Sequence, residues 1–236
     1  DLSGHIPDLA AAQLSDAALA KIAKINPDKL PKFRGKPRIA CPIANVGKFI
    51  AIGLNFSDHA KETGAPIPKE PIIFTKATSC IQGPNDAVML PKGSTKSDWE
   101  VELGVVIGTR ASYVKQKDAL QHVAGYVLIN DVSEREYQME RGGTWDKGKG
   151  CDTFGPIGPW LVTRDEIENV AKDEKDVESV QLDCRVDGAP SDATDDVKKS
   201  DTMKRGRVWE IWDRQTGRGF LGCPKLQGGP DPRGSR

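Results

Sequence analysis

The chain has 236 residues, with 34 lysines and arginines against 34 aspartates and glutamates. This length suits one large domain or a domain with a small appendage. Because the charges balance, no global field favours nucleic acid or an acidic membrane surface, and we expect neither as a partner.

The cysteines and the apolar runs indicate the compartment. Five cysteines are scattered along the chain without Cys-x-x-Cys spacing, which argues against a zinc cluster and against a disulfide framework. No run of about 18 apolar residues occurs, and the chain does not start with a basic and then apolar signal segment. The sequence therefore predicts a soluble protein of the reducing cytoplasm.

Residues 1–45 are expected to form a small N-terminal segment with one helix. Ser15 is a suitable N-cap, Leu19 and Ile22 share one face, and Asn26-Pro27 provides a stop signal. The proline-rich stretch that follows has the composition of a linker.

From Lys48 onward the pattern changes to short apolar runs separated by glycine and proline. Such runs are typical of β-strands. The predicted strands cover 49–54, 72–74, 101–107 and 126–129. Helical signals between them are few and short, so the expected fold class is a β-rich α+β fold.

The C-terminal part begins regularly and then loses its pattern. Thr163 and Glu166 form a capping box for a short helix, residues 180–186 alternate as a half-buried strand, and Asp187-Gly188 is a hairpin turn signal. The polar stretch 189–199 offers no obvious returning strand. We therefore expect a core over 46–188 that is incomplete at its C-terminal end, and a largely disordered tail over 189–236.

Two acidic side chains stand out at the start of the strand 101–107. Strand alternation places Glu100 and Glu102 on one face, and Val101, Leu103 and Val105 on the other. A hard divalent cation would relieve the repulsion between the two carboxylates. The spacing alone favours a solvated strand face, so other segments must decide between that face and a metal site.

Three further side chains could belong to the same site. Asp131 directly ends an apolar run, as expected when a buried strand delivers a polar group, although an Asn-Asp pair also suits a simple turn. His59 and Glu62 are three residues apart, a spacing that joins side chains on a helical turn. The carboxylate could orient the histidine as a general base, but surface pairs of this kind are common.

Taken together, the segments from about Val46 to Gly188 resemble the fumarylacetoacetate hydrolase superfamily. The motifs are Gly-Leu-Asn-Phe-x-x-His, Glu-x-Glu-Leu, Asn-Asp-Val-Ser-x-Arg and Lys-Gly-x-Asp-Thr-Phe-Gly-Pro-x-Gly-Pro-Trp, in that order. The resemblance implies rolled mixed β-sheets around a metal site, and a homodimer.

The resemblance also implies roles for individual side chains. The ligands of Mg²⁺ or Mn²⁺ would be Glu100, Glu102 and Asp131, and the catalytic residues would be His59, Glu62 and Lys149. Lys76 and Arg135 would support substrate binding. The aromatic residues Trp145, Phe154 and Trp160 are expected to serve in packing.

The implied reaction is hydrolysis of a carbon–carbon bond in a small 2-oxo acid. A 2,4-dioxo acid, either an acylpyruvate or a diketo-deoxy sugar acid, would give pyruvate and a second acid. Ureidoglycolate lyase, a hydroxy-dienedioate isomerase and an oxaloacetate decarboxylase remain alternatives. Relatives continue past the Asp-Gly turn with a Pro-Gly-Asp and a Thr-Gly-Thr-Pro segment, which this chain lacks after Gly188. A non-catalytic remnant is therefore an alternative of another class.

Overall fold

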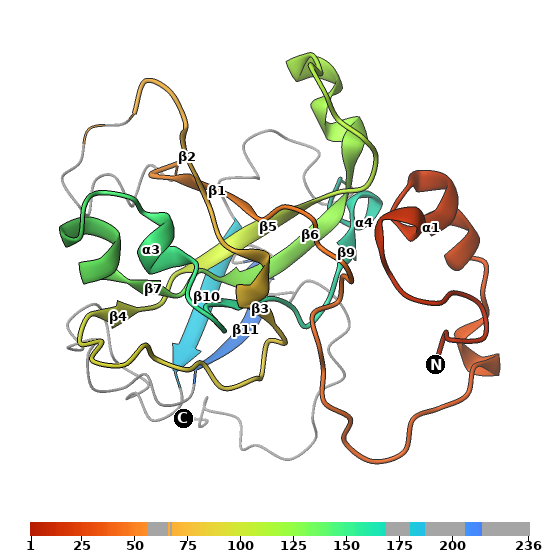
Figure 1. Ribbon diagram of the computed structural model, residues 1–236. Helices are drawn as coiled ribbons and strands as arrows, with labels where there is room; N and C mark the ends of the chain where they lie inside the picture. The colour runs from red at the N-terminus through yellow and green to blue at the C-terminus, as the bar shows by residue number, and fades with distance from the viewer. Residues whose placement is uncertain (56–65, 67, 169–179, 187–205, 214–236) are drawn as a thin grey trace, which may run out of the picture.

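A three-stranded antiparallel sheet forms the centre of the computed structural model, which describes residues 1–55, 66, 68–168, 180–186 and 206–213. Its strands are β5 (Val101–Ile107), β6 (Val123–Asn130) and β9 (Val162–Thr163), with β6 in the middle. Figure 1 shows β5 and β6 side by side across the middle of the molecule. Because β6 pairs on both edges, it is almost entirely buried.

Short strand pairs surround this sheet. They are β1 (Ile50–Gly53) with β2 (Ile72–Thr75), β3 (Ile81–Gln82) with β8 (Gly155–Pro156), and β4 (Ser97–Asp98) with β7 (Ser133–Glu134). The pair β3–β8 is parallel and the other two pairs are antiparallel. The helices are short and lie in the connections, so the predicted β-rich α+β fold is confirmed.

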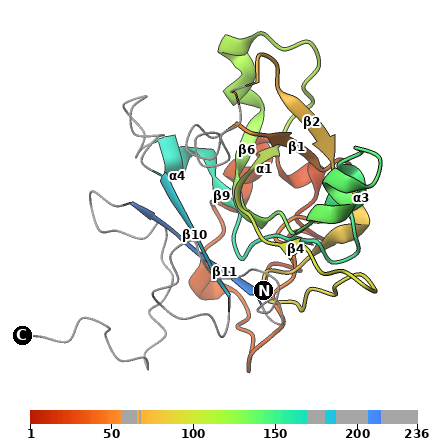
Figure 2. The ribbon, with the colours of Figure 1, turned by 90° about the vertical axis from the view of Figure 1, so that its left-hand side faces the viewer.

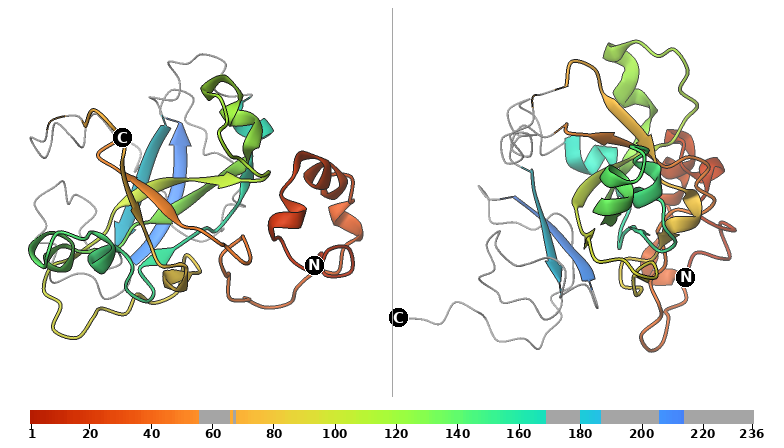
Figure 3. Two further views of the ribbon diagram at one scale, coloured as in Figure 1. Left: turned by 45° about the horizontal axis from the view of Figure 1, so that its top comes forward. Right: turned by 60° about the vertical axis from the view of Figure 1, so that its left-hand side comes forward.

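The strand predicted over 180–186 does have a partner. β10 (Val180–Val186) pairs antiparallel with β11 (Gly206–Asp213), so the expectation that no strand returns is wrong. The returning strand comes later than the turn signal suggests, after a polar stretch rather than directly behind it. Figures 2 and 3 show the two strands running together beside the central sheet, where β10 contacts β5 and β11 contacts β6. The turn at Asp187-Gly188 and the rest of 189–236 lie outside the described residues.

The N-terminal segment packs onto the central sheet. Helix α1 (Asp16–Ile22) begins after the predicted cap, where Ser15 Oγ accepts a hydrogen bond from the amide of Ala18 at 3.4 Å. The helix ends before the predicted stop, and Asn26 instead caps the 3₁₀ turn η2 (Pro27–Lys29). Three further one-turn or irregular elements follow along the chain as η3 (Thr78–Cys80), η4 (Gln116–His122) and η5 (Glu136–Glu140).

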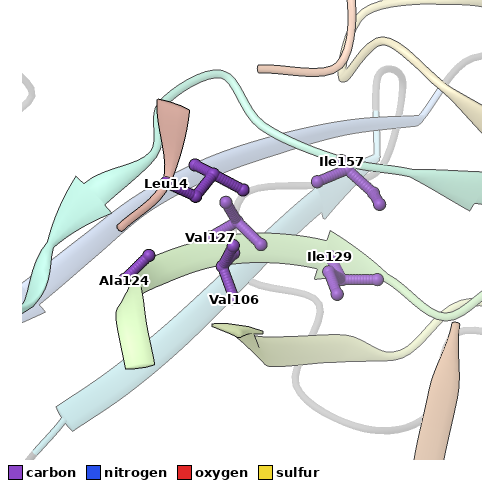
Figure 4. Close-up of a cluster of buried hydrophobic side chains, with 6 residues drawn as sticks. All are labelled: Leu14, Val106, Ala124, Val127, Ile129 and Ile157. Atoms are coloured by element: carbon purple, nitrogen blue, oxygen red, sulfur yellow. The ribbon is translucent and has the colours of Figure 1, made fainter. Parts of the chain in front are cut away.

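The main core joins side chains from this segment, the sheet and the loop before β9. Its buried members are Leu14, Val106, Ala124, Val127, Ile129 and Ile157, drawn in Figure 4. The alternation along β5 is as predicted, but the buried apolar side chain is Val106, whereas Val105 is 53% exposed. The reason is that β5 turns Gly104 and Val106, rather than the odd-numbered valines, toward this core.

The predicted packing residues fall into two groups. Phe154 is fully buried, and Trp145 packs against Phe74 with ring centroids 5.3 Å apart. Trp160 is 50% exposed, so about half of its surface packs against the described residues. Within these ranges, none of the helices has the length and apolar character that a membrane crossing requires.

Candidate metal and active site

The register of β5 and β6 brings two predicted metal ligands together. Val101 pairs with Asn130, so Glu100, just before β5, lies beside Asp131, just after β6. The amide of Asp131 donates a hydrogen bond to the carbonyl of Glu100 at 2.8 Å, and the amide of Glu100 donates to Asn130 Oδ1 at 3.3 Å. Both backbones are therefore fixed at the point where the carboxylates leave the sheet.

Lys149 connects these two carboxylates. It ends the short helix α3 (Asp146–Lys149), which lies beside β7 and η5. Its Nζ donates to Glu100 Oε2 at 2.7 Å and to Asp131 Oδ2 at 2.8 Å, and the residue is only 2% exposed. The predicted catalytic lysine thus contacts two of the three predicted metal ligands.

Lys76, just after β2, reaches Asp131 from the other side. Its Nζ donates to Asp131 Oδ1 at 2.6 Å and to the carbonyl of Val132 at 3.1 Å. It also donates to the carbonyl of Lys149. The side chain has no exposed surface, which is rare for lysine unless it is paired.

Arg135 binds Oε1 of Glu100, the oxygen that Lys149 does not contact. Its Nη2 lies 2.5 Å from Glu100 Oε1 and 2.8 Å from Asp98 Oδ2. Burial opposes the charged form, but the two carboxylates prevail and raise the pKa of the guanidinium above its ordinary value. Arg135 therefore remains a cation that balances the acidic cluster.

Glu102 is the third predicted ligand, and the charges of the other two change the pKa of its carboxyl. Burial, together with the negative charges of Glu100 and Asp131, raises the pKa of its carboxyl to about 7, and Lys149 opposes this rise. The three carboxylates are thus close enough to repel one another. An added positive charge would favour the ionised form of Glu102.

The donor set suits a hard divalent cation, because carboxylate oxygens are the ligands that Mg²⁺ and Mn²⁺ prefer. Across the described ranges, no group of three histidine, cysteine, aspartate or glutamate side chains is arranged to hold an ion. Two of the candidate oxygens instead accept hydrogen bonds from Lys149. A cation would compete with this ammonium for Glu100 Oε2 and Asp131 Oδ2.

The remaining predicted site residues are His59 and Glu62, which lie outside the described residues. Their roles stay predictions. Two buried acids next to the predicted site were not predicted from the sequence. Asp98 accepts from Arg135, and Glu134 is fully buried with Oε2 accepting from the amide of Tyr137 at 2.7 Å. Asp98 could have been predicted from its position two residues before Glu100. No sequence pattern marks Glu134 as a residue of the site.

Comparison with known proteins identifies the family. The model of the fumarylacetoacetate (FAA) hydrolase C-terminal family matches residues 48–203. The chain belongs to this family. The match covers the strands and the α3 segment that carry the acidic cluster.

Curated relatives agree with this assignment. A Burkholderia ambifaria protein named as a hydrolase is 60% identical over 188 residues, covering 80% of this chain and 64% of the relative. A Burkholderia cenocepacia protein with the same kind of name is 64% identical over 167 residues, covering 71% of this chain and 59% of the relative. The chain therefore spans less than two thirds of the length of these relatives.

Solved structures share the fold of this family member. A protein from Mycobacterium smegmatis described as HpcE is 33% identical with a TM-score of 0.61, covering 75% of this chain and 61% of that structure. The fumarylacetoacetate hydrolase of Exiguobacterium antarcticum is 30% identical with a TM-score of 0.58, covering 70% of this chain and 59% of that structure.

Proposed function

We propose that this family member is a divalent-metal-dependent hydrolase that cleaves a carbon–carbon bond of a 2,4-dioxo acid to give pyruvate and a second acid. The observation that carries the proposal is the buried junction of Lys149 with Glu100 and Asp131. It combines oxygen ligands for a cation with an ammonium group for a developing negative charge. We further propose that the enzyme works as a homodimer.

In this proposal Glu100, Glu102 and Asp131 hold Mg²⁺ or Mn²⁺. When bound, the ion would supply Lewis-acid chemistry that polarises the 2-oxo acid. Arg135 orients Glu100 through its 2.5 Å contact. The positive charge of the bound ion would also attract the carboxylate of the substrate.

Lys149 is proposed to stabilise negative charge on the pyruvate half of the substrate as the carbon–carbon bond breaks. A fixed ammonium in a site that excludes water is more effective than the same group in water. His59, oriented by Glu62, is proposed to take a proton from the attacking water.

The test is pyruvate release from a panel of acylpyruvates and 2,4-diketo sugar acids with Mg²⁺, and again after chelation by EDTA. We expect pyruvate release that EDTA abolishes. In the variant Lys149→Met, kcat should fall about 10²–10³-fold, the cost typical of losing one group that stabilises a developing oxyanion. The matched control is Lys147→Met on the same helix, which removes an exposed ammonium bound to the carbonyl of Arg141.

Two results would contradict the proposal. Formation of glyoxylate and urea from ureidoglycolate, without cleavage of any dioxo acid, would assign the site to a lyase. Absence of turnover in a chain that melts cooperatively and binds Mg²⁺ would favour the non-catalytic remnant.

A further inference from the structure

The end of β2 lies along the short helix α3, and successive residues of the two elements contact one another (Figure 2). The ring of Phe74 packs against that of Trp145, with centroids 5.3 Å apart. The amide and the hydroxyl of the next residue, Thr75, both donate to Asp146 Oδ1, at 3.1 and 2.5 Å. These contacts lie one turn of helix before Lys149, the proposed catalytic lysine at the end of α3.

Lys149 itself also contacts β2 and the residue after it. Its Nζ lies over the ring of Phe74, 5.2 Å from the centroid, where the aromatic face attracts a cation. Its carbonyl accepts a hydrogen bond from Lys76, which follows Thr75 directly. The place of the Lys149 ammonium therefore depends on how α3 is joined to β2.

Asp146 supplies the polar side chain of this junction and is exposed. The hydrogen bonds from Thr75 lower the pKa of its carboxyl below the ordinary value, so it is ionised at neutral pH. Both bonds end on Oδ1, an oxygen that an asparagine would also present. Because the side chain is exposed, its removal does not open the hydrophobic core.

We propose that Asp146 is a positioning residue, which fixes α3 through Thr75 so that Lys149 holds its ammonium between Glu100 and Asp131. Helix α3 has only four residues, and a helix that short is not stable without contacts to the rest of the protein. The consequence for catalysis rests on the function proposed above, whereas the consequence for the place of Lys149 does not.

The alternative is that Asp146 acts through its charge, because an acidic side chain in the first turn stabilises a helix. Asp146→Asn separates the two roles, since it removes the charge but keeps an oxygen that can accept both bonds from Thr75. Asp146→Ala removes the charge and the acceptor together. Under our proposal the asparagine variant behaves like the parent, and under the charge alternative it behaves like the alanine variant.

The first measurement reports the place of Lys149 without any substrate. Brief acetylation with acetic anhydride, followed by peptide mass spectrometry, compares the labelling rates of several lysines in one sample. In the parent, the exposed Lys147 should react quickly, whereas Lys149 and Lys76, each 2% exposed, should be protected. In Asp146→Ala we expect labelling of Lys149 to rise roughly tenfold, the change in local opening that the loss of one or two hydrogen bonds allows. Lys76 should stay protected.

Two further variants control this measurement. Asp146→Asn should keep the parental labelling of Lys149. Thr75→Val removes the hydroxyl donor but not the amide donor, so it should raise the labelling less than Asp146→Ala does. Parental protection of Lys149 in Asp146→Ala, or equal labelling in the alanine and asparagine variants, would overturn the proposal. Joint labelling of Lys149 and Lys76 would also overturn it, because that result shows a general loosening and not a displacement of α3.

The second measurement is the rate of pyruvate release. Asp146→Ala should lower kcat about 10–10²-fold with little change in KM, because a displaced ammonium stabilises the developing charge less but leaves substrate binding in place. Asp146→Asn should restore most of the parental kcat. Parental kcat in an Asp146→Ala variant whose Lys149 is labelled would overturn the catalytic consequence. If the parent releases no pyruvate, the proposed function fails, and the labelling alone decides whether Asp146 positions Lys149.

Discussion

Asp131 pairs with two buried ammonium groups, whereas Glu100 pairs with one of them, Lys149, and with Arg135, which is 31% exposed. We predict that Asp131→Ala and Glu100→Ala both lose Mg²⁺ binding, because each removes an oxygen ligand. Asp131→Ala should also destabilise the fold by about 3–5 kcal/mol, since Lys76 would be left without its carboxylate in a fully buried place. Glu100 is 19% exposed, and its removal leaves Arg135 paired with Asp98.

Calorimetry with Mg²⁺ and urea denaturation of both variants would check this difference. Asp28→Ala, in an exposed turn of the N-terminal segment, is a suitable control for the loss of a carboxylate. Parental Mg²⁺ affinity in either site variant would remove that residue from the site. An equal loss of stability in both would mean that Lys76 does not depend on Asp131.

Cys80 is completely buried and packs with Val132 and Phe154. Burial raises the pKa of its thiol to about 11, and Lys76 opposes this rise. At pH 8 only about one thiol in a thousand would be ionised, and the thiolate is the reactive form. We predict that iodoacetamide labels Cys151 well before Cys80 in the native protein, as measured by peptide mass spectrometry.

The same shift predicts the sign of a stability change with pH. The unfolded thiol ionises near pH 9 and the folded one only near 11, so the contribution of Cys80 is fully present below about pH 9 and is lost as pH rises toward 11. Cys80→Ser should flatten this part of the stability profile. Labelling of Cys80 as fast as Cys151 would contradict the burial on which both expectations rest.

At this level the sequence allowed the acids and the basic residues of the site to be predicted, but not which of them pair. Glu100 and Asp131 were predicted from family motifs, and the structure brings them together. The burial of Lys76 could not be predicted, because its charge is tolerated only through Asp131, 55 residues further along the chain. Nothing in the local sequence of Lys76 distinguishes it from a surface lysine.

Helix α3 owes its position to a glycine. A Cβ atom at Gly148 would lie 2.2 Å from the carbonyl of Glu134 and 2.6 Å from the amide of Gln138. Both obstacles are backbone atoms, so Gly148→Ala must displace the helix and with it Lys149. We predict a loss of about 1–3 kcal/mol in the free energy of unfolding and weaker contact of Lys149 with the carboxylates.

Urea denaturation and the kcat of pyruvate release would follow the two effects of this substitution. Gly47→Ala is the matched control, because a Cβ there meets no atom within 4 Å. Its stability should stay within about 0.5 kcal/mol of the parent. Parental stability and turnover in Gly148→Ala would show that α3 does not depend on this close approach.

The longer elements could be predicted and the shortest could not. The strand predicted over 101–107 coincides with β5, and the one over 126–129 extends to the full β6. Their β-branched residues give a pattern over several positions. Two-residue strands such as β4 and β7 have too few positions to show any period. The partner of β10 was missed because a hairpin signal locates a returning strand only when the connection is short.

The N-terminal segment and the sheet share one hydrophobic core. Leu14 is 4% exposed and packs with Val106 and Ala124. We predict that Leu14→Ala lowers the free energy of unfolding by about 2–5 kcal/mol, the range for a buried leucine. Phe33→Ala, a larger truncation in the same segment, should have little effect, because Phe33 is 70% exposed.

Thermal melting and urea denaturation would compare the two variants. Under the predicted division at residue 45, an independent N-terminal unit would unfold in a transition of its own. One transition, shifted by Leu14→Ala, would instead show that the segment and the core unfold together. A Leu14→Ala variant as stable as Phe33→Ala would contradict the shared core.

The pairing of β5 with β6 has a consequence for how the chain folds. The hairpin joins Glu100 and Asn130 across 30 residues, whereas Lys76 reaches Asp131 across 55. Closing a shorter loop costs less entropy, so the hairpin and the contact of Lys149 with Asp131, 18 residues apart, would form first. Part of the repulsion between the carboxylates would then persist until Lys76 arrives. Ions from the solution would lower that transient repulsion. Stopped-flow refolding should therefore be faster with Mg²⁺ than with a monovalent salt of equal ionic strength, and equal rates would show that the lysines arrive with the acids.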